Sequence, residues 1–177
     1  LRRQVATIGD LDFAASSKNP EKVVKYFTEM PGVAEILGEG ENKATLVLDS
    51  GMHVDLLVGQ PETYGALLQH FTGDKNHNIK LRTYALKKGL SLSEEGIKNV
   101  KTGKIVATET EVEFYKLLKM ETPAPEIRED TGEIEAALKH ELPDLVLPKD
   151  IKGDFHLHSN FPIDSSHDYG SGSLEEI

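Results

Sequence analysis

The chain is 177 residues long, which is enough for one or two domains with a buried core. It has no cysteine, so disulfides and thiolate metal sites are excluded, and its apolar runs are too short to cross a membrane. The net charge of −10 argues against indiscriminate nucleic-acid binding, although residues 75–88 are basic enough for local phosphate contacts. We expect a cytoplasmic piece of a longer protein, because neither a signal peptide nor an initiator methionine is present.

The first predicted element is a buried strand within residues 5–17, which carries Asp10 and Asp12. Side chains alternate along a strand, so both carboxylates point to the same face. Their repulsion is relieved either by solvent at an exposed strand end or by a divalent cation such as Mg²⁺ or Mn²⁺, and this pattern alone favours neither. Arg2 and Arg3, just before the strand, are either a solvated pair or an anion contact.

A helix and three strands should follow. Asn19 and Pro20 begin a helix that runs to about residue 29, and strands are expected over 33–37, 43–48 and 52–58. Asp55 is the one acid in the V-D-L-L-V run of the last strand, and it can join the earlier pair if the two strands are neighbours. Three carboxylates on paired strands favour a two-metal site for phosphoryl transfer.

The next stretch is predicted to be mainly helical, with helices over 62–71, 75–88 and 111–119 and irregular β structure over 90–106. The Thr72-Gly73 break is either an ordinary helix cap or a kink beside a nucleotide. Prolines then indicate a stiff linker. After it, an acidic stretch with a short helix over 132–140 separates two units.

The last part of the chain changes character. Residues 151–159 are predicted to form a strand on which His156 and His158 share a face. This H-x-H spacing suits Zn²⁺ or Mn²⁺, and an incidental histidine pair is the alternative. Acids close by, Asp164 and Asp168 among them, favour the metal site.

With these residues in hand, the chain resembles a family X DNA polymerase of the bacterial and archaeal kind. That group is similar to DNA polymerase beta and carries a C-terminal polymerase-and-histidinol-phosphatase (PHP) domain. The opening L-R-R through G-D-L-D matches the family's paired arginines and G-D-x-D, and H-V-D-L-L-V matches its third carboxylate. H-F-T-G-D-K-N-H-N-I-K-L-R is similar to the thumb signature, and G-D-F-H-L-H-S to the first PHP motif. The S-D-G that usually follows is altered here to F-P-I-D-S-S-H-D-Y-G-S.

The resemblance implies a role for each matching residue. Asp10, Asp12 and Asp55 would be the catalytic residues and would bind two Mg²⁺ ions, with Asp55 nearer the primer 3′-hydroxyl. His70 stands where many members have a tyrosine. The remaining implied residues are Arg3 at the triphosphate, Phe71 and Gly73 under the deoxyribose, Asn78 at the base, Lys75, Lys80 and Arg82 at DNA phosphates or the template, and His156, His158 and Asp164 as PHP ligands of Mn²⁺ or Zn²⁺.

The expected fold class is α+β. A nucleotidyltransferase palm sheet over residues 1–60 is followed by a small α+β thumb over 61–122, which carries the nucleotide- and template-facing helix. An acidic linker over 123–150 then leads to the first strand of a PHP domain over 151–177.

We expect a monomeric DNA repair enzyme that fills gaps by template-directed synthesis, with DNA and dNTPs as its substrates. One alternative is that the PHP part acts as a metal-dependent 3′–5′ exonuclease or phosphoesterase. Another is an inactive fragment that only binds nucleotide or DNA. A stand-alone nucleotidyltransferase is disfavoured, because such enzymes usually lack the template-facing thumb helix. For the 177 residues alone we expect little or no polymerase activity.

Overall fold

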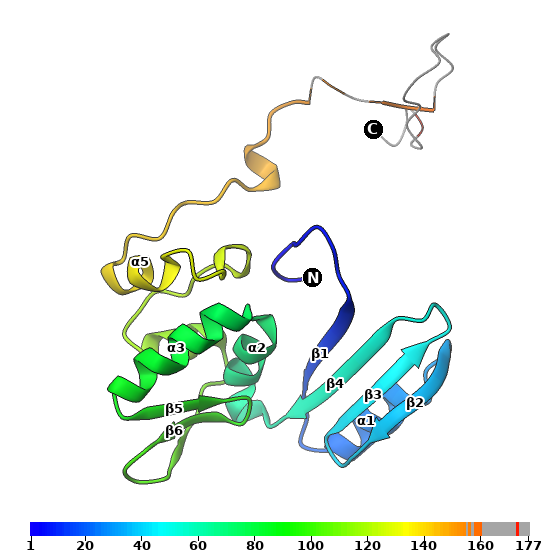
Figure 1. Ribbon diagram of the computed structural model, residues 1–177, viewed down its shortest axis with the longest axis horizontal. Helices are drawn as coiled ribbons and strands as arrows, with labels where there is room; N and C mark the ends of the chain where they lie inside the picture. The colour runs from blue at the N-terminus through cyan, green and yellow to red at the C-terminus, as the bar shows by residue number, and fades with distance from the viewer. Residues whose placement is uncertain (155, 157, 161–172, 174–177) are drawn as a thin grey trace. The chain divides into compact units, whose positions relative to one another are not determined.

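The computed structural model describes residues 1–154, 156, 158–160 and 173, and it divides the chain into two compact units, Leu1–Leu142 and Pro143–Ile177 (Figure 1). The first unit contains two small sheets and five α-helices among the described residues, which confirms the predicted α+β class. None of the described helices is both long enough and apolar enough to cross a lipid bilayer.

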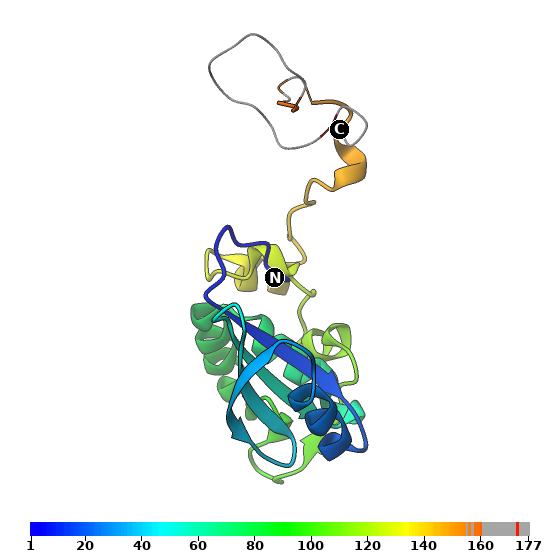
Figure 2. The ribbon, with the colours of Figure 1, turned by 90° about the vertical axis from the view of Figure 1, so that its right-hand side faces the viewer.

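The palm is a four-stranded sheet with one helix packed on it. Its strands are β1 (Asp10–Ser16), β2 (Val33–Glu39), β3 (Lys43–Leu48) and β4 (His53–Gly59), in the order β1-β4-β3-β2. β1 pairs with β4 in parallel, and the other two pairings are antiparallel. The helix α1 (Pro20–Thr28) lies against β3 and β4 on one face of the sheet (Figure 2).

Alternation of side chains explains this packing. Val54, Leu56 and Val58 of β4 are all buried, and they meet Val24 and Phe27 of α1 in one core. The expectation that the first strand is buried was wrong. Among the described residues β1 is the edge strand and pairs only with β4, so its Asp10, Asp12 and Phe13 are exposed.

The thumb has its own core. Its elements are η1 (Pro61–Thr63), α2 (Tyr64–Thr72), α3 (Lys75–Lys87), β5 (Leu90–Ser93), β6 (Gly96–Asn99), β7 (Ile105–Val106) and α4 (Glu111–Leu117). Asp74 caps α3 by accepting a hydrogen bond from His77 N at 2.8 Å. Thr110 and Glu113 form a capping box at the start of α4. Leu81, Phe114 and Tyr115 are fully buried where these helices meet.

The acidic segment after the thumb differs from the expected linker over 123–150. Up to Leu142 it belongs to the first unit, through η2 (Pro125–Ile127) and α5 (Glu133–Lys139). Ile134 and Ala137 of α5 are buried in the thumb core, and Arg128 is fully buried. The apolar face of α5 drives this packing, and Lys80 of α3 pairs with Glu135 of α5.

The residues of the second unit that the structure describes include one short helix, η3 (Pro148–Asp150). The strand predicted over 151–159 is not formed by the residues of that stretch that the structure describes. Asp164 and Asp168, the two acids proposed beside the histidine pair, lie outside the described residues.

Candidate active site

The parallel strands β1 and β4 bring three acidic residues to one face of the palm sheet. Asp12 and Asp55 are register partners, and Asp10 lies two residues before Asp12. The alternate residues Leu11 and Val54 pack in the core beneath α1, so the three carboxylates lie on the opposite face. Strand pairing thus places Asp55 beside the D-x-D pair.

Asp12 carries the electrostatic cost of this arrangement. Partial burial raises the pKa of Asp12, and the charges of Asp10 and Asp55 raise it further. Asp55 in turn accepts a hydrogen bond from the hydroxyl of Thr45 on β3. Carboxylate oxygens are the donors that Mg²⁺ prefers, so the donor set fits that ion. Among the residues that the structure describes, however, no three His, Cys, Asp or Glu side chains converge closely enough to hold a metal together.

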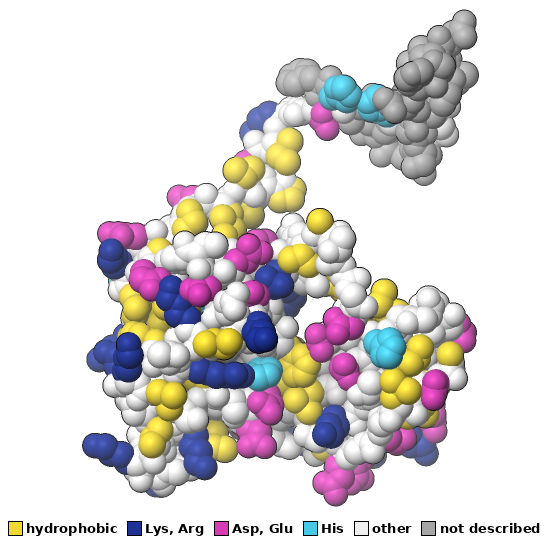
Figure 3. Space-filling view, in the orientation of Figure 1, with side chains coloured by type: hydrophobic (Ala, Val, Ile, Leu, Met, Phe, Trp, Pro, Cys, Tyr) yellow, Lys and Arg dark blue, Asp and Glu magenta, His cyan; other side chains and the backbone are white. Residues whose placement is uncertain are grey.

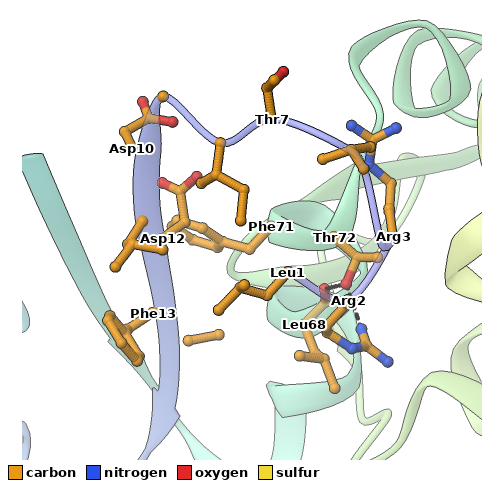
Figure 4. Close-up of a pocket in the computed structure, with 15 residues that line it drawn as sticks. Leu1, Arg2, Arg3, Thr7, Asp10, Asp12, Phe13, Leu68, Phe71 and Thr72 are labelled. Atoms are coloured by element: carbon orange, nitrogen blue, oxygen red, sulfur yellow. Dashed lines mark hydrogen bonds between the residues drawn. The ribbon is translucent and has the colours of Figure 1, made fainter. Parts of the chain in front are cut away.

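An open pocket of about 410 Å³ lies beside the carboxylates. It is lined by the N-terminal residues, by β1 and by the end of α2, and both Asp10 and Asp12 border it. Figure 4 shows the two aspartates on β1, with Phe71 next to Asp12 and Arg3 farther along the N-terminal segment. The pocket therefore combines acids, an arginine and an apolar ring, which suits a ligand with a cation-bound phosphate and a flat group.

Both N-terminal arginines pair with acidic side chains, Arg2 with one in the thumb and Arg3 with one in the acidic segment. Arg2 donates hydrogen bonds to Thr72 of α2 and to Glu111 of α4, the latter at 2.6 Å. Arg3 Nη1 lies 3.7 Å from Glu129 Oε1. Arg2 therefore fastens the segment before β1 to the thumb, a role that the sequence did not reveal.

Glu111 joins this contact to a second, buried arginine. Arg128 Nη1 donates to Glu111 Oε1 at 2.6 Å, while Nε and Nη2 donate to the Pro123 carbonyl at 3.0 and 2.9 Å. Its guanidinium also lies 5.1 Å from the centre of the Tyr115 ring. Burial by itself raises the pKa of Glu111, but hydrogen bonds from Arg2 and Arg128 bring it below its usual value.

The thumb residues predicted to face a nucleotide gather at the junction of α2 and α3. Phe71 lines the pocket, and Gly73 ends α2 with a left-handed φ of 70°. Asn78 Nδ2 donates to the His70 carbonyl at 2.9 Å, and Arg82 Nη2 lies 3.1 Å from His70 Nδ1. The structure therefore brings these predicted residues together around His70.

Comparison with known proteins agrees with this geometry. Residues 67–129 match the family described as DNA polymerase beta thumb. The chain is also 34% identical over 163 residues to DNA polymerase/3'-5' exonuclease PolX of Bacillus subtilis (strain 168), an alignment that covers 91% of this chain. Both matches support a fragment of a family X DNA polymerase. It spans 28% of the length of that relative.

The two lysines expected to contact DNA differ in whether their charge is already paired. Lys75 is exposed in the first turn of α3. Lys80 is paired with Asp130 at 2.8 Å and with Glu135 at 2.9 Å, and the hydrogen bonds that it donates to these carboxylates raise its pKa to about 12. Figure 3 shows basic side chains mainly over the thumb half of the visible face and acidic ones over both halves.

A buried histidine network also joins the thumb to the acidic segment. His77 Nδ1 lies 2.6 Å from Glu133 Oε1, and its Nε2 lies 2.9 Å from the Tyr115 hydroxyl. Burial lowers the pKa of His77 despite this carboxylate, so the ring is neutral, Nδ1–H donates to Glu133 and Tyr115 donates to Nε2. Sequence reasoning missed this network, because nothing local distinguishes a buried helix histidine from an exposed one.

In the second unit, the side chains of His156 and His158 do meet. Their Nε2 atoms are 2.8 Å apart, and His156 N donates to Asp154 Oδ1 at 3.0 Å. Both histidines are exposed. Imidazole nitrogens suit Mn²⁺ or Zn²⁺, so the pair fits the implied type of ion, but the third predicted ligand, Asp164, falls in the part of the chain not described.

Proposed function

We propose that the protein carrying this chain synthesises DNA on a template, with gapped DNA and dNTPs as substrates, in a gap-filling role. The observation that carries the proposal is the pairing of Asp12 with Asp55 on adjacent parallel strands, with Asp10 on the same face beside the pocket. The similarity to family X DNA polymerases supports it, as does the B. subtilis relative, which is named a DNA polymerase/3'-5' exonuclease.

In the proposed mechanism the palm carboxylates carry the chemistry. Asp10, Asp12 and Asp55 would hold Mg²⁺, which when bound lowers the pKa of the attacking primer 3′-hydroxyl and neutralises the triphosphate. Their mutual repulsion, expressed in the raised pKa of Asp12, favours a cation at this position.

The other side chains at the pocket would bind and orient the substrates. Arg3 would contact the triphosphate, and Phe71 would pack under the deoxyribose. Gly73 leaves room for a close approach because it has no side chain. Asn78 would face the base, while Arg82 and Lys75 would contact the template strand and its phosphates. Lys80 is already paired with Asp130 and Glu135, so at DNA its charge would be divided between these carboxylates and a phosphate.

The experiment is insertion of one nucleotide into gapped DNA with Mg²⁺ by the full-length protein. Asp12→Ala is expected to abolish extension, because it removes a central carboxylate. Glu21→Ala removes one exposed acid from α1, on the other face of the sheet, and is the matched control that should leave extension unchanged. Extension that survives Asp12→Ala would overturn the proposal.

We propose a second activity for the C-terminal part, a metal-dependent 3′–5′ exonuclease or phosphoesterase with Mn²⁺ or Zn²⁺. The contact between His156 and His158 supports it. The test is Mn²⁺-dependent shortening of a labelled primer by full-length protein, with a double variant His156→Ala/His158→Ala. Degradation at an unchanged rate in the double variant would remove this assignment.

A further inference from the structure

His70 is the point where the nucleotide-facing thumb residues converge, and the proposed mechanism gives its side chain no role. Its ring lies edge-to-face on Phe71, with ring centres 5.7 Å apart. Its carbonyl accepts from Asn78 Nδ2 at 2.9 Å, and its Nδ1 lies 3.1 Å from Arg82 Nη2. Asn78 and Arg82 are one turn apart on α3, so Asn78 contacts the backbone of His70 while Arg82 contacts its ring.

The chemistry of this contact fixes the state of the ring. A guanidinium has donors only, so His70 Nδ1 must accept from Arg82 and therefore carries no proton. Glu94 Oε2 lies 3.8 Å from the same nitrogen, too far for a hydrogen bond. Burial lowers the pKa of His70, and Arg82 lowers it further while Glu94 and Asp12 act in the opposite direction. The ring is the neutral tautomer with its proton on Nε2.

The contact with His70 Nδ1 restricts the side-chain conformation of Arg82. An arginine side chain has many rotamers, and fixing it costs conformational entropy each time it engages a ligand. An acceptor that holds one Nη group keeps the planar guanidinium oriented beforehand, which leaves its other donors aimed for the substrate. Gln69 Nε2 donates to Asn78 Oδ1 at 2.7 Å, so the same helix junction also orients Asn78.

We propose that His70 is a positioning residue that holds Arg82 through Nδ1 and thereby sets the discrimination between matched and mismatched nucleotides. This inference rests on the proposed polymerase function. Two substitutions separate it from simple packing. His70→Phe keeps a ring against Phe71 but removes the acceptor. His70→Asn loses the ring but places an amide oxygen near the position of Nδ1. Both keep the carbonyl that Asn78 contacts.

The experiment measures kcat/KM for the matched and the mismatched dNTP on gapped DNA with Mg²⁺ at pH 7.5, using full-length protein. His70→Phe is expected to reduce discrimination about tenfold, which corresponds to ~1.4 kcal/mol in the transition state. His70→Asn should stay within about twofold of wild type, a free-energy difference of ~0.4 kcal/mol. In an Arg82→Met background, His70→Phe should have no further effect, because its partner is already gone.

The outcomes are distinct. If wild type extends the primer and His70→Phe discriminates equally well, or if His70→Asn falls as far as His70→Phe, the inference is overturned alone. A wild type that does not extend overturns the proposed function and this inference with it. Independently of activity, the imidazole ¹⁵N spectrum of the 177-residue chain should show the Nε2–H tautomer at His70. A protonated Nδ1 there would contradict the inference, even if a variant failed to fold.

Discussion

Removing Arg128 tests how the acidic segment is fastened to the thumb. Arg128 is fully buried and donates to Glu111 and, twice, to the Pro123 carbonyl. Deleting one partner of a buried ion pair commonly costs about 3–5 kcal/mol, because the other charge is left without compensation. Here Glu111 keeps Arg2 on its second oxygen at 2.6 Å, so Arg128→Ala should fall at the lower end, about 3 kcal/mol.

The assay is urea unfolding of the 177-residue chain, followed by circular dichroism. A loss of this size would also lower the melting temperature by about 6–12 °C for a chain of this length. The control is Lys25→Ala, which breaks an exposed pair with Glu29 (3.8 Å) and should change stability by less than ~0.5 kcal/mol. If Arg128→Ala changed stability no more than Lys25→Ala, our view that a buried charge network holds this segment would be refuted.

Three further predictions concern stability. Thr110→Ala should cost ~1 kcal/mol in urea unfolding, because it removes the capping box of α4, and an unchanged midpoint would contradict this. Gly65→Ala should cost at least ~2 kcal/mol, since a Cβ there would lie 2.2 Å from the Thr110 carbonyl oxygen, whereas Gly38→Ala, with nothing within 4 Å, should be nearly neutral. Acidification should also destabilise the fold. The lowered pKa of buried His77 means that the folded state resists its protonation, so stability is full above a pH of about 6.5 and falls below it. The loss between pH 7.5 and 5.5 should be smaller in His77→Gln, and an equal loss in both proteins would refute the assignment.

Much of the palm could be predicted because its pattern is local. The α1 helix begins at Pro20 as expected, and β3 and β4 follow the apolar alternation closely. The place of β1 at the sheet edge could not be predicted in this way. Apolar residues around Asp10 and Asp12 suggest burial, but exposure depends on how many strands pair with β1, and in the part of the chain that the structure describes only β4 does.

The acidic segment shows the other limit of sequence reasoning. Its composition and prolines are typical of a linker, since charged residues next to each other in sequence repel. In the folded chain those charges meet partners far away in sequence: Asp130 and Glu135 meet Lys80, and Glu133 meets the neutral ring of His77. Pairings over such distances leave no periodic signal, so neither this contact nor the fastening of Arg2 to Glu111 could be read from the sequence.

The most direct test of the central claim is the insertion rate of Asp55→Asn. Asp55 lies on a different strand from Asp10 and Asp12 and joins them only through the register between β1 and β4. Losing a ligand that stabilises charge in the transition state costs several kcal/mol, so insertion into gapped DNA with Mg²⁺ by full-length protein should fall about 10³-fold or more. Glu21→Gln on the opposite face should leave the rate unchanged. An Asp55→Asn protein that inserts nucleotides at the wild-type rate would contradict the three-carboxylate site.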